Sequence, residues 1–219
     1  MSADTNYEFE RQRMVDQQLV NRDITDPRVL DAMRTVPRHL FVPEEHRYLA
    51  YADGPLPIGT DQTISQPYIV ALMSQLLELH GDENVLEIGT GSGYQAAILG
   101  HLAAVVHTVE RHPALARQAQ ARLRALKLDN VHVEIGDGTQ GWPAAAPYAA
   151  VLVTAAAPYA PKPLLNQLAL GGRLIIPVGG RTGQHLQRWV RRSEDEFERE
   201  ILTPVAFVPL VGEEGWEES

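Results

Sequence analysis

The sequence predicts an α/β protein whose centre is a mostly parallel, doubly wound sheet. From about residue 81 onward, short apolar runs of strand type alternate with longer runs of helical spacing. A glycine-rich turn separates the first of these strands from the helix after it, and the last two strand-like segments follow each other without a helix. Because parallel strands need a crossover and successive strands can pair directly, we expect a parallel sheet that ends in an antiparallel edge hairpin.

The first eighty residues predict a helical segment in front of this sheet. Residues 1 to about 7 are expected to be unstructured, and residues 8–22 to form a polar helix. Asp26 and Pro27 are typical of a helix start, because aspartate can cap the free amides and proline suits the first helical position. A second helix and a further short one are expected after them.

The segment 53–67 is rich in glycine, proline, aspartate and threonine and predicts a long irregular loop. Long loops inside a compact sequence usually carry function. A helix over residues 67–80 is expected to follow, and Gly81 and Asp82 would end it before the first core strand. The functional residues of the N-terminal part are therefore expected in this loop.

The elements of the core follow in a regular order. Parallel strands are expected at 85–88, 105–110, 131–135, 149–154 and 173–178, with helices at 94–102, 113–127 and 162–169. The hairpin is expected from the segments 184–191 and 199–208. We interpret the chain as a single domain over 1–219, with an N-terminal segment over 8–80 and an α/β core over 81–212.

Composition narrows the possible functions. The formal net charge of −9 opposes a nucleic-acid partner, since such proteins bind mainly by neutralising phosphates. The chain has no cysteine, which excludes a disulfide, a thiolate nucleophile and a zinc–cysteine site, and its eight histidines show no metal-ligand spacing, so no metal is expected. The first thirty residues lack an apolar run of signal-peptide type, and no run is long enough to span a membrane. We expect a cytoplasmic protein without a membrane partner.

The turn Gly89-Thr90-Gly91-Ser92-Gly93 predicts a ligand site. Glycine tolerates tight dihedral angles and lets backbone amides approach a ligand closely. The dinucleotide fingerprint Gly-x-Gly-x-x-Gly requires glycine at position 94, where this chain has Tyr94. NAD is therefore disfavoured.

Two acidic residues indicate which ligand binds instead. Glu87 lies at the carboxyl end of the first core strand, and Glu110 ends the second. Both carboxylates are expected in one crevice, where Glu110 could accept from a ribose diol and Glu87 could face a cation. A nucleoside with a positive charge and no phosphate corresponds to S-adenosylmethionine.

Several motifs resemble one family, protein-L-isoaspartate (D-aspartate) O-methyltransferase, from about residue 11 to 212. The loop upstream of the core and the segment after the last strand are the more specific motifs, whereas the glycine turn occurs in many methyltransferases. The motifs are Asp61-Gln62-Thr63-Ile64-Ser65-Gln66-Pro67, 85–93, Gly136-Asp137-Gly138, Ala155-Ala156-Ala157-Pro158, Gly171-Gly172-Arg173-Leu174 and Phe207-Val208-Pro209-Leu210.

The resemblance implies a Rossmann-like fold and methyl transfer from S-adenosylmethionine, with S-adenosylhomocysteine as product. The acceptor would be the free α-carboxylate of an isoaspartyl residue in an aged protein or peptide, and the methyl ester would then lead to repair through a succinimide. Because that carboxylate is already ionised at neutral pH, no general base is required. The family habit is a monomer, which we expect here.

The resemblance also assigns residues. Ser65 is expected to be catalytic, with its hydroxyl holding the acceptor carboxylate, and neutral donors are expected there rather than an arginine clamp. Substrate contacts are expected from Thr63, Ile64, Gln66, Pro67 and Val208. Cofactor contacts are expected from Glu87, Gly89, Thr90, Gly91, Ser92, Gly93, Glu110, Arg111, Asp137 and Gly138.

Several of these residues have a structural alternative. Ser65 precedes a helix and could be an ordinary N-cap. Thr63 and Gln66 could only stabilise the loop, and Glu87 could only cap amides of the glycine turn. Asp137 could accept from the exocyclic amine of adenine, or it could bond its own backbone in a turn.

Two other functions stay open at the level of sequence. A methyltransferase that acts on a small molecule could use the same fold, because fold alone does not settle function. A non-catalytic nucleoside-binding module is the second alternative, in which the loop around Ser65 is only a lid.

Overall fold

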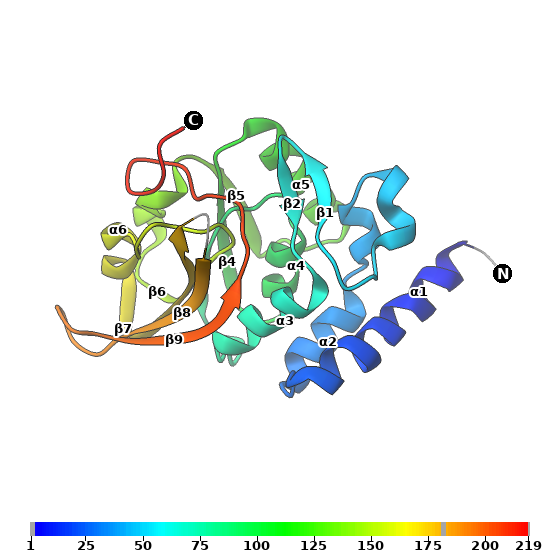
Figure 1. Ribbon diagram of the computed structural model, residues 1–219, viewed down its shortest axis with the longest axis horizontal. Coiled ribbons are helices and arrows are strands. Elements are labelled where there is room, and N and C mark those ends of the chain that lie inside the picture. Colours follow the sequence, from blue (N-terminus) through cyan, green and yellow to red (C-terminus); the bar gives the residue numbers. More distant parts are fainter. Residues whose placement is uncertain (1–2, 181–182, 219) are drawn as a thin grey trace.

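A seven-stranded sheet forms the centre of the protein in the computed structural model, which describes residues 3–180 and 183–218 (Figure 1). The strand order is β5-β4-β3-β6-β7-β8-β9. The pairs from β5 to β7 are parallel, and β8 pairs antiparallel with both of its neighbours. The prediction of a parallel sheet with an antiparallel edge hairpin is confirmed.

The strands lie close to their expected positions. They are β3 (Asn84–Ile88), β4 (Val105–Glu110), β5 (Val131–Ile135), β6 (Tyr148–Val153), β7 (Leu168–Gly180), β8 (Gly183–Arg191) and β9 (Phe197–Val205). β7 begins five residues earlier than expected because Leu168 pairs with Tyr148, ahead of an irregularity after which Ala150 pairs with Arg173. β9 ends at Val205, so the residues around Val208 do not belong to the hairpin.

The helices of the core are shorter than expected. They are α3 (Pro67–Leu76), α4 (Tyr94–Gly100), α5 (Pro113–Ala125) and α6 (Lys162–Asn166). α3 ends early because Glu78 adopts a left-handed backbone with φ of 50°, which interrupts a helix. α6 ends at Asn166 since β7 already begins two residues later.

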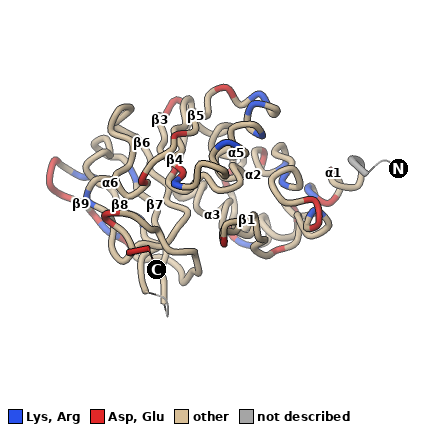
Figure 2. The backbone as a smooth tube through the Cα atoms, turned by 90° about the horizontal axis from the view of Figure 1, so that it is seen from above, with Lys and Arg blue, Asp and Glu red and all other residues tan. Residues whose placement is uncertain are grey.

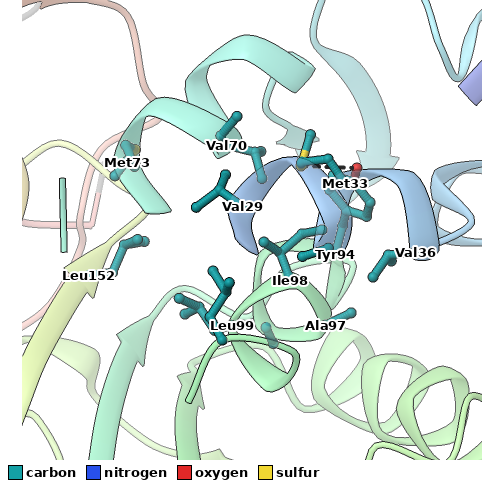
Figure 3. Close-up of a cluster of buried hydrophobic side chains, with 14 of the residues drawn as sticks. Val29, Met33, Val36, Val70, Met73, Tyr94, Ala97, Ile98, Leu99 and Leu152 are labelled. Carbon is teal, nitrogen blue, oxygen red and sulfur yellow. Dashed lines mark hydrogen bonds between the residues drawn. The ribbon is translucent and has the colours of Figure 1, made fainter. Parts of the chain in front are cut away.

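Alternate residues of the strands face two separate cores. Val85 and Val106 belong to a cluster with the N-terminal helices, whereas Leu86 and Val109 belong to a cluster that includes Leu164 of α6. Figure 3 shows part of the first cluster, in which side chains from α2, α3 and α4 meet a residue of β6. The sheet is therefore covered on both faces, as a doubly wound fold requires.

The N-terminal segment is helical almost from its start. α1 (Ala3–Met14) continues into a π-helical turn (Val15–Leu19) and a 3₁₀ turn (Val20–Arg22). The expectation of an unstructured start is wrong for residues 3–7, while residues 1 and 2 lie outside the described part. The sequence has N-cap residue types at several positions here, Ser2, Asp4, Thr5 and Asn6 among them, so it does not single out one helix start.

The second helix forms as predicted. α2 (Pro27–Thr35) is capped by Asp26, whose carboxylate accepts from the amides of Arg28 and Val29. Two 3₁₀ turns follow, η3 (Arg38–Phe41) and η4 (Glu44–Leu49). Figure 1 places α1 and α2 beside α3, at the end of the molecule opposite the edge hairpin.

The loop over 53–67 is not irregular throughout, which corrects the prediction. β1 (Leu56–Gly59) and β2 (Gln62–Ile64) form a small antiparallel hairpin. Its turn residues Thr60 and Asp61 have φ of 50° and 54°. A tight hairpin turn of this hand requires positive φ at both central residues, a role that Asn-Gly usually signals. Threonine and aspartate gave no such signal.

Charged residues of both signs occur along the whole chain, from the N-terminal helices to the edge hairpin (Figure 2). On the hairpin, Arg188 pairs with Glu78 and Glu200, and Arg173 also pairs with Glu78. The pairs with Glu78 connect β7 and β8 to the segment after α3, and the pair with Glu200 connects β8 to β9. Because such pairs are partly exposed, each contributes little to stability.

Candidate active site

The glycine turn lies between the carboxyl end of β3 and the start of α4. The strand order changes direction at β3, because β4 lies on one side of it and β6 on the other. Gly89 has φ of 94°, and a Cβ at that position would lie 2.4 Å from the Thr154 hydroxyl oxygen. That hydroxyl donates to the carbonyls of Ile88 and Gly89 at 3.0 and 2.7 Å. The end of β6 therefore holds the turn so closely that only glycine fits there.

Two neighbouring cavities open at the carboxyl ends of the parallel strands. Including the space open to solvent, the smaller measures about 420 Å³ and the larger about 690 Å³. Ser65 lines the smaller cavity, and Glu110 lines the larger one. Both cavities are lined by Thr63, Gly89, Gly91 and Thr154. The two spaces thus form adjoining parts of one site, at the place where ligands bind in open α/β sheets.

Glu110 connects the second strand to the glycine turn. Its carboxylate is almost fully buried and accepts from the amides of Gly91 at 2.8 Å and His112 at 2.9 Å. Each carboxylate oxygen has a second lone pair. Glu110 can therefore accept from a ligand hydroxyl in the larger cavity without giving up either bond.

Glu87 lies beneath the turn rather than on a cavity wall. The side chain is fully buried, and Oε2 accepts from the Thr108 hydroxyl at 2.5 Å. Among the described residues Oε1 has no hydrogen-bond partner. Burial raises the pKa of Glu87 to about 8, the Thr108 bond lowers it, and the charge of Glu110 raises it. Glu87 thus bonds a side chain of β4, whereas its alternative interpretation was that it caps amides of the glycine turn. Its contact with the cofactor stays a prediction.

Ser65 lies on the wall of the smaller cavity, directly before α3. The N-cap of α3 is Gln66, and no side chain caps this helix. The Ser65 carbonyl accepts from Arg38 at 2.7 Å. The capping alternative for Ser65 is thus not what the structure contains, and the hydroxyl is not occupied by the helix.

The other residues of the upstream loop divide into two groups. Thr63 and Ile64 line the smaller cavity next to Ser65. Gln66 and Pro67 line neither cavity, although Ile69, Val70 and Met73 further along α3 line the smaller one. Their expected contact with substrate stays a prediction, with geometry in favour of Thr63 and Ile64.

The Asp137 carboxylate forms hydrogen bonds within a turn, which was the alternative interpretation of this residue. One carboxylate oxygen accepts from the Thr139 amide and hydroxyl at 2.9 and 2.8 Å, and the other accepts from the Glu213 amide at 2.9 Å. Its neighbour Gly138 lines the larger cavity, and a Cβ there would lie 2.5 Å from Ile88 Cγ2. The backbone after Asp137 therefore faces the cavity, and adenine recognition by its carboxylate stays a prediction.

The remaining predicted residues lie around the same site. Thr90 and Ser92 are buried and line the smaller cavity, and Gly93 is the left-handed N-cap of α4. Arg111 lines the larger cavity and forms an ion pair with Glu218 at 2.7 Å. Val208 also lines this larger cavity, and its carbonyl accepts from the Ala156 amide at 2.8 Å. The expected contact of Val208 with substrate stays a prediction.

Seven residues that line the smaller cavity were not predicted as site residues: Ile69, Val70, Met73, Tyr94, Gln95, Thr154 and Phe207. Thr154 ends a predicted strand, which was a usable signal. Phe207 is held by the side-chain amide of Gln184, which accepts from its N–H at 2.7 Å and donates to its carbonyl at 3.1 Å. Nothing in the sequence relates these two positions. Among the described residues, no lysine, arginine or histidine lines this cavity. The expectation of neutral donors stays a prediction.

Residues 3–180 and 183–218 lack two features that would indicate other functions. They contain no cluster of three potential metal-binding side chains. They also contain no helix with the length and apolarity needed to cross a bilayer. The expected absence of a metal stays a prediction.

Comparison with known proteins was made for sequence and structure. Residues 9–215 match the family model of protein-L-isoaspartate(D-aspartate) O-methyltransferase. The protein-L-isoaspartate O-methyltransferase 2 of Pelobacter propionicus is 56% identical over 212 residues, covering 96% of this chain and 94% of its own. The protein-L-isoaspartate O-methyltransferase of Methanoregula boonei is 57% identical over 208 residues, covering 95% of each chain.

Solved structures agree in fold. A protein-L-isoaspartate O-methyltransferase aligns with a TM-score of 0.86 and 26% identity, covering 94% of this chain and 67% of its own. A Plasmodium falciparum protein described as a putative enzyme of this type, solved in complex with S-adenosyl-L-homocysteine, aligns with a TM-score of 0.80 and 24% identity, covering 92% and 98%. By sequence, this chain belongs to the protein-L-isoaspartate (D-aspartate) O-methyltransferase family.

Proposed function

We propose that this protein transfers a methyl group from S-adenosylmethionine to the free α-carboxylate of isoaspartyl residues in proteins and peptides. Family membership over residues 9–215 supports this activity. One observation supports the assignment of residues. The two cavities share the lining residues Thr63, Gly89, Gly91 and Thr154, and Ser65 lines the smaller cavity while Glu110 lines the larger one. A donor and an acceptor bound there would lie next to each other.

The larger cavity fits the nucleoside part of the cofactor. The Plasmodium relative binds S-adenosyl-L-homocysteine, which supports the same type of ligand here. Glu110 would accept from the ribose hydroxyls, and the backbone around Gly138 leaves room for the base. Because residues 89 and 91 are glycines, no side chain from these positions fills the space between the cavities.

The buried carboxyl of Glu87 also fits a cationic ligand nearby. Its Oε1 is a buried polar atom that no group within residues 3–180 and 183–218 satisfies, and such atoms are rare. When bound, the cofactor supplies a methyl group on a positively charged sulfur. A positive charge close to the turn would favour the ionised form of Glu87.

Ser65 would orient the acceptor carboxylate. The α-carboxyl group has an ordinary pKa of about 3.5, so it is ionised at neutral pH and no base has to remove a proton. The hydroxyl of Ser65 would donate to one carboxylate oxygen, and the other oxygen would attack the methyl carbon while the carbon–sulfur bond breaks. Holding two reactants in line can lower a barrier by roughly 7 to 11 kcal/mol.

The neutral lining of the smaller cavity suits this reaction. The carboxylate and the sulfonium lose their opposite charges together as the methyl group moves. An arginine held against the carboxylate would stabilise the reactant more than the transition state and would slow the step. Neutral donors such as Ser65 and Thr63 position the carboxylate without that effect.

The proposal is tested with methyl-labelled S-adenosylmethionine and two matched peptides that differ only in an aspartyl or isoaspartyl linkage. Base-labile label on the isoaspartyl peptide alone is the expected result. Equal labelling of both peptides would contradict isoaspartyl selectivity. Label on neither peptide, but on a small carboxylic acid, would indicate a different acceptor. The monomeric state, the cytoplasmic location and the absence of nucleic-acid partners stay predictions.

A further inference from the structure

Arg38 is a fully buried cation in the N-terminal segment. It begins the turn η3, and its guanidinium donates to two backbone carbonyls. Nε donates to Ala50 at 2.8 Å, and Nη2 donates to Ser65 at 2.7 Å. The second bond joins this buried residue directly to the backbone of the residue proposed to hold the acceptor.

The same guanidinium also contacts the element after the glycine turn. Its Cζ lies 4.9 Å from the centre of the Tyr94 ring. Tyr94 is the first residue of α4 and lines the smaller cavity together with Ser65. We call the loop 62–66 around Ser65 the acceptor loop and the glycine turn 89–93 the donor loop. One side chain therefore contacts both the acceptor loop and the helix that follows the donor loop.

Arg38 has no carboxylate among its direct contacts within residues 3–180 and 183–218, and its Nη1 has no hydrogen-bond partner there. Burial lowers its pKa to about 10, which leaves it charged at neutral pH. Burying a cation without a counter-ion is costly, and apolar residues of similar size often fill such positions at least as well. Packing alone therefore does not explain an arginine here.

We infer that Arg38 is a positioning residue, which fixes the place of Ser65 relative to the donor loop by holding the Ser65 carbonyl. This inference rests on the proposed function. A fixed carbonyl sets the peptide plane after Ser65 and hence the direction in which its hydroxyl points into the smaller cavity. Because Tyr94 directly follows the glycine turn, the contact with its ring also fixes Arg38 relative to the donor loop.

Arg28 provides a matched control within the same segment. Its guanidinium donates to two backbone carbonyls, Leu79 at 2.7 Å and Leu102 at 2.8 Å. It thus joins α2 to the core in the same manner, yet it lines neither cavity. A variant at Arg28 reports the effect of losing such bonds without touching the acceptor loop.

The experiment compares Arg38→Lys, Arg38→Met and Arg28→Lys with the wild type. Lysine keeps the charge but cannot hold two carbonyls in a fork, and methionine keeps much of the volume without the charge. Turnover of an isoaspartyl peptide, affinity for S-adenosylhomocysteine by calorimetry, thermal unfolding and amide hydrogen exchange over residues 62–66 are measured for each. The exchange measurement does not depend on catalysis.

Both Arg38 variants are expected to lose about 100-fold in kcat, the effect of a misplacement of about 1 Å, while affinity for S-adenosylhomocysteine changes less than about threefold. Exchange over 62–66 should rise, and that over 89–93 should not. Arg28→Lys should unfold at a lower temperature with kcat unchanged.

Four results would overturn the inference. The first is a folded Arg38 variant whose kcat stays within twofold of wild type, and the second is an equal loss of kcat in Arg28→Lys. The third is a loss of S-adenosylhomocysteine affinity in the Arg38 variants that parallels their loss of kcat. The fourth is the failure of both Arg38 variants to fold. If the wild type methylates no isoaspartyl peptide, the proposed function fails separately. Exchange over 62–66 then decides whether Arg38 holds this loop.

Discussion

The donor side and the acceptor side of the site are built in different ways. On the donor side, the glycine turn and Glu110 lie at the ends of neighbouring strands, and their bonds run between β3, β4 and β6. On the acceptor side, Ser65 follows a small hairpin and is held by Arg38, 27 residues away. The sheet itself therefore fixes the donor side, whereas the acceptor side lies outside the seven-stranded sheet and depends on a side chain of the N-terminal segment.

The largest expected effect concerns the donor side. Gly89→Ala places a Cβ 2.4 Å from the Thr154 hydroxyl at a φ of 94°, so the turn has to move. Loss of measurable S-adenosylhomocysteine binding in calorimetry is expected, because the displaced turn no longer leaves space between the cavities. Gly54→Ala is the control, since a Cβ there meets nothing within 4 Å. Unchanged binding by Gly89→Ala would show that the donor side is not fixed by the sheet.

Ser65→Ala separates the two sides. The variant should bind S-adenosylhomocysteine within about threefold of wild type and lose about 100-fold in kcat on an isoaspartyl peptide, as when one positioned donor is removed. Steady-state kinetics and calorimetry measure the two quantities. The exposed Ser193→Ala should change neither. A loss of cofactor affinity equal to the loss of kcat would place Ser65 on the donor side.

The pH dependence of stability tests the buried carboxyl of the donor side. The pKa of Glu87 is raised from 4.5 to about 8 in the folded protein, so folding retains a proton that the unfolded chain releases. The free energy of unfolding should therefore fall between pH 4.5 and about 8 by a few kcal/mol. Below pH 4.5 and above pH 8 this contribution does not change with pH.

Glu87→Gln should remove this part of the pH dependence. Denaturant unfolding of wild type and variant, both without cofactor, gives the difference at each pH. The wild type should lose stability relative to the variant as the pH rises through this window. A constant difference between the two proteins would mean that Glu87 titrates normally.

A smaller effect is expected where Gln184 holds Phe207 on the acceptor side. Gln184→Ala removes both hydrogen bonds to the Phe207 backbone. We expect KM for the isoaspartyl peptide to rise by up to about 30-fold, since the two lost bonds contribute about 1 kcal/mol each, while affinity for S-adenosylhomocysteine stays within about twofold. An effect on cofactor affinity alone would place Phe207 on the donor side.

The same contrast explains how much could be predicted from the sequence. The glycine turn, Glu110 and the alternation of strands are local patterns, and they predicted the sheet and the position of the turn and of Glu110 at the ends of its strands. Contact of these residues with the cofactor stays a prediction. Positive φ at Thr60 and Asp61 has no local signal, so the β1–β2 hairpin was missed. Arg38 and Phe207 reach the site through tertiary contacts, and spacing along the chain does not reveal such contacts.

Asp137 shows a limit of motif-based assignment within the donor side itself. Its position after a core strand favoured contact with adenine, yet three hydrogen bonds engage its carboxylate in a turn and with the C-terminal segment. The backbone at Gly138 faces the cavity instead. A motif can thus mark the right place in the fold while the contact is made by a neighbouring group.

The most direct test of the account is a crystal structure with S-adenosylhomocysteine and an isoaspartyl peptide bound together. The account predicts the ribose at Glu110, the sulfur beside Gly89 and the peptide α-carboxylate within hydrogen-bond distance of the Ser65 hydroxyl. A carboxylate bound away from Ser65, or a nucleoside outside the larger cavity, would contradict it.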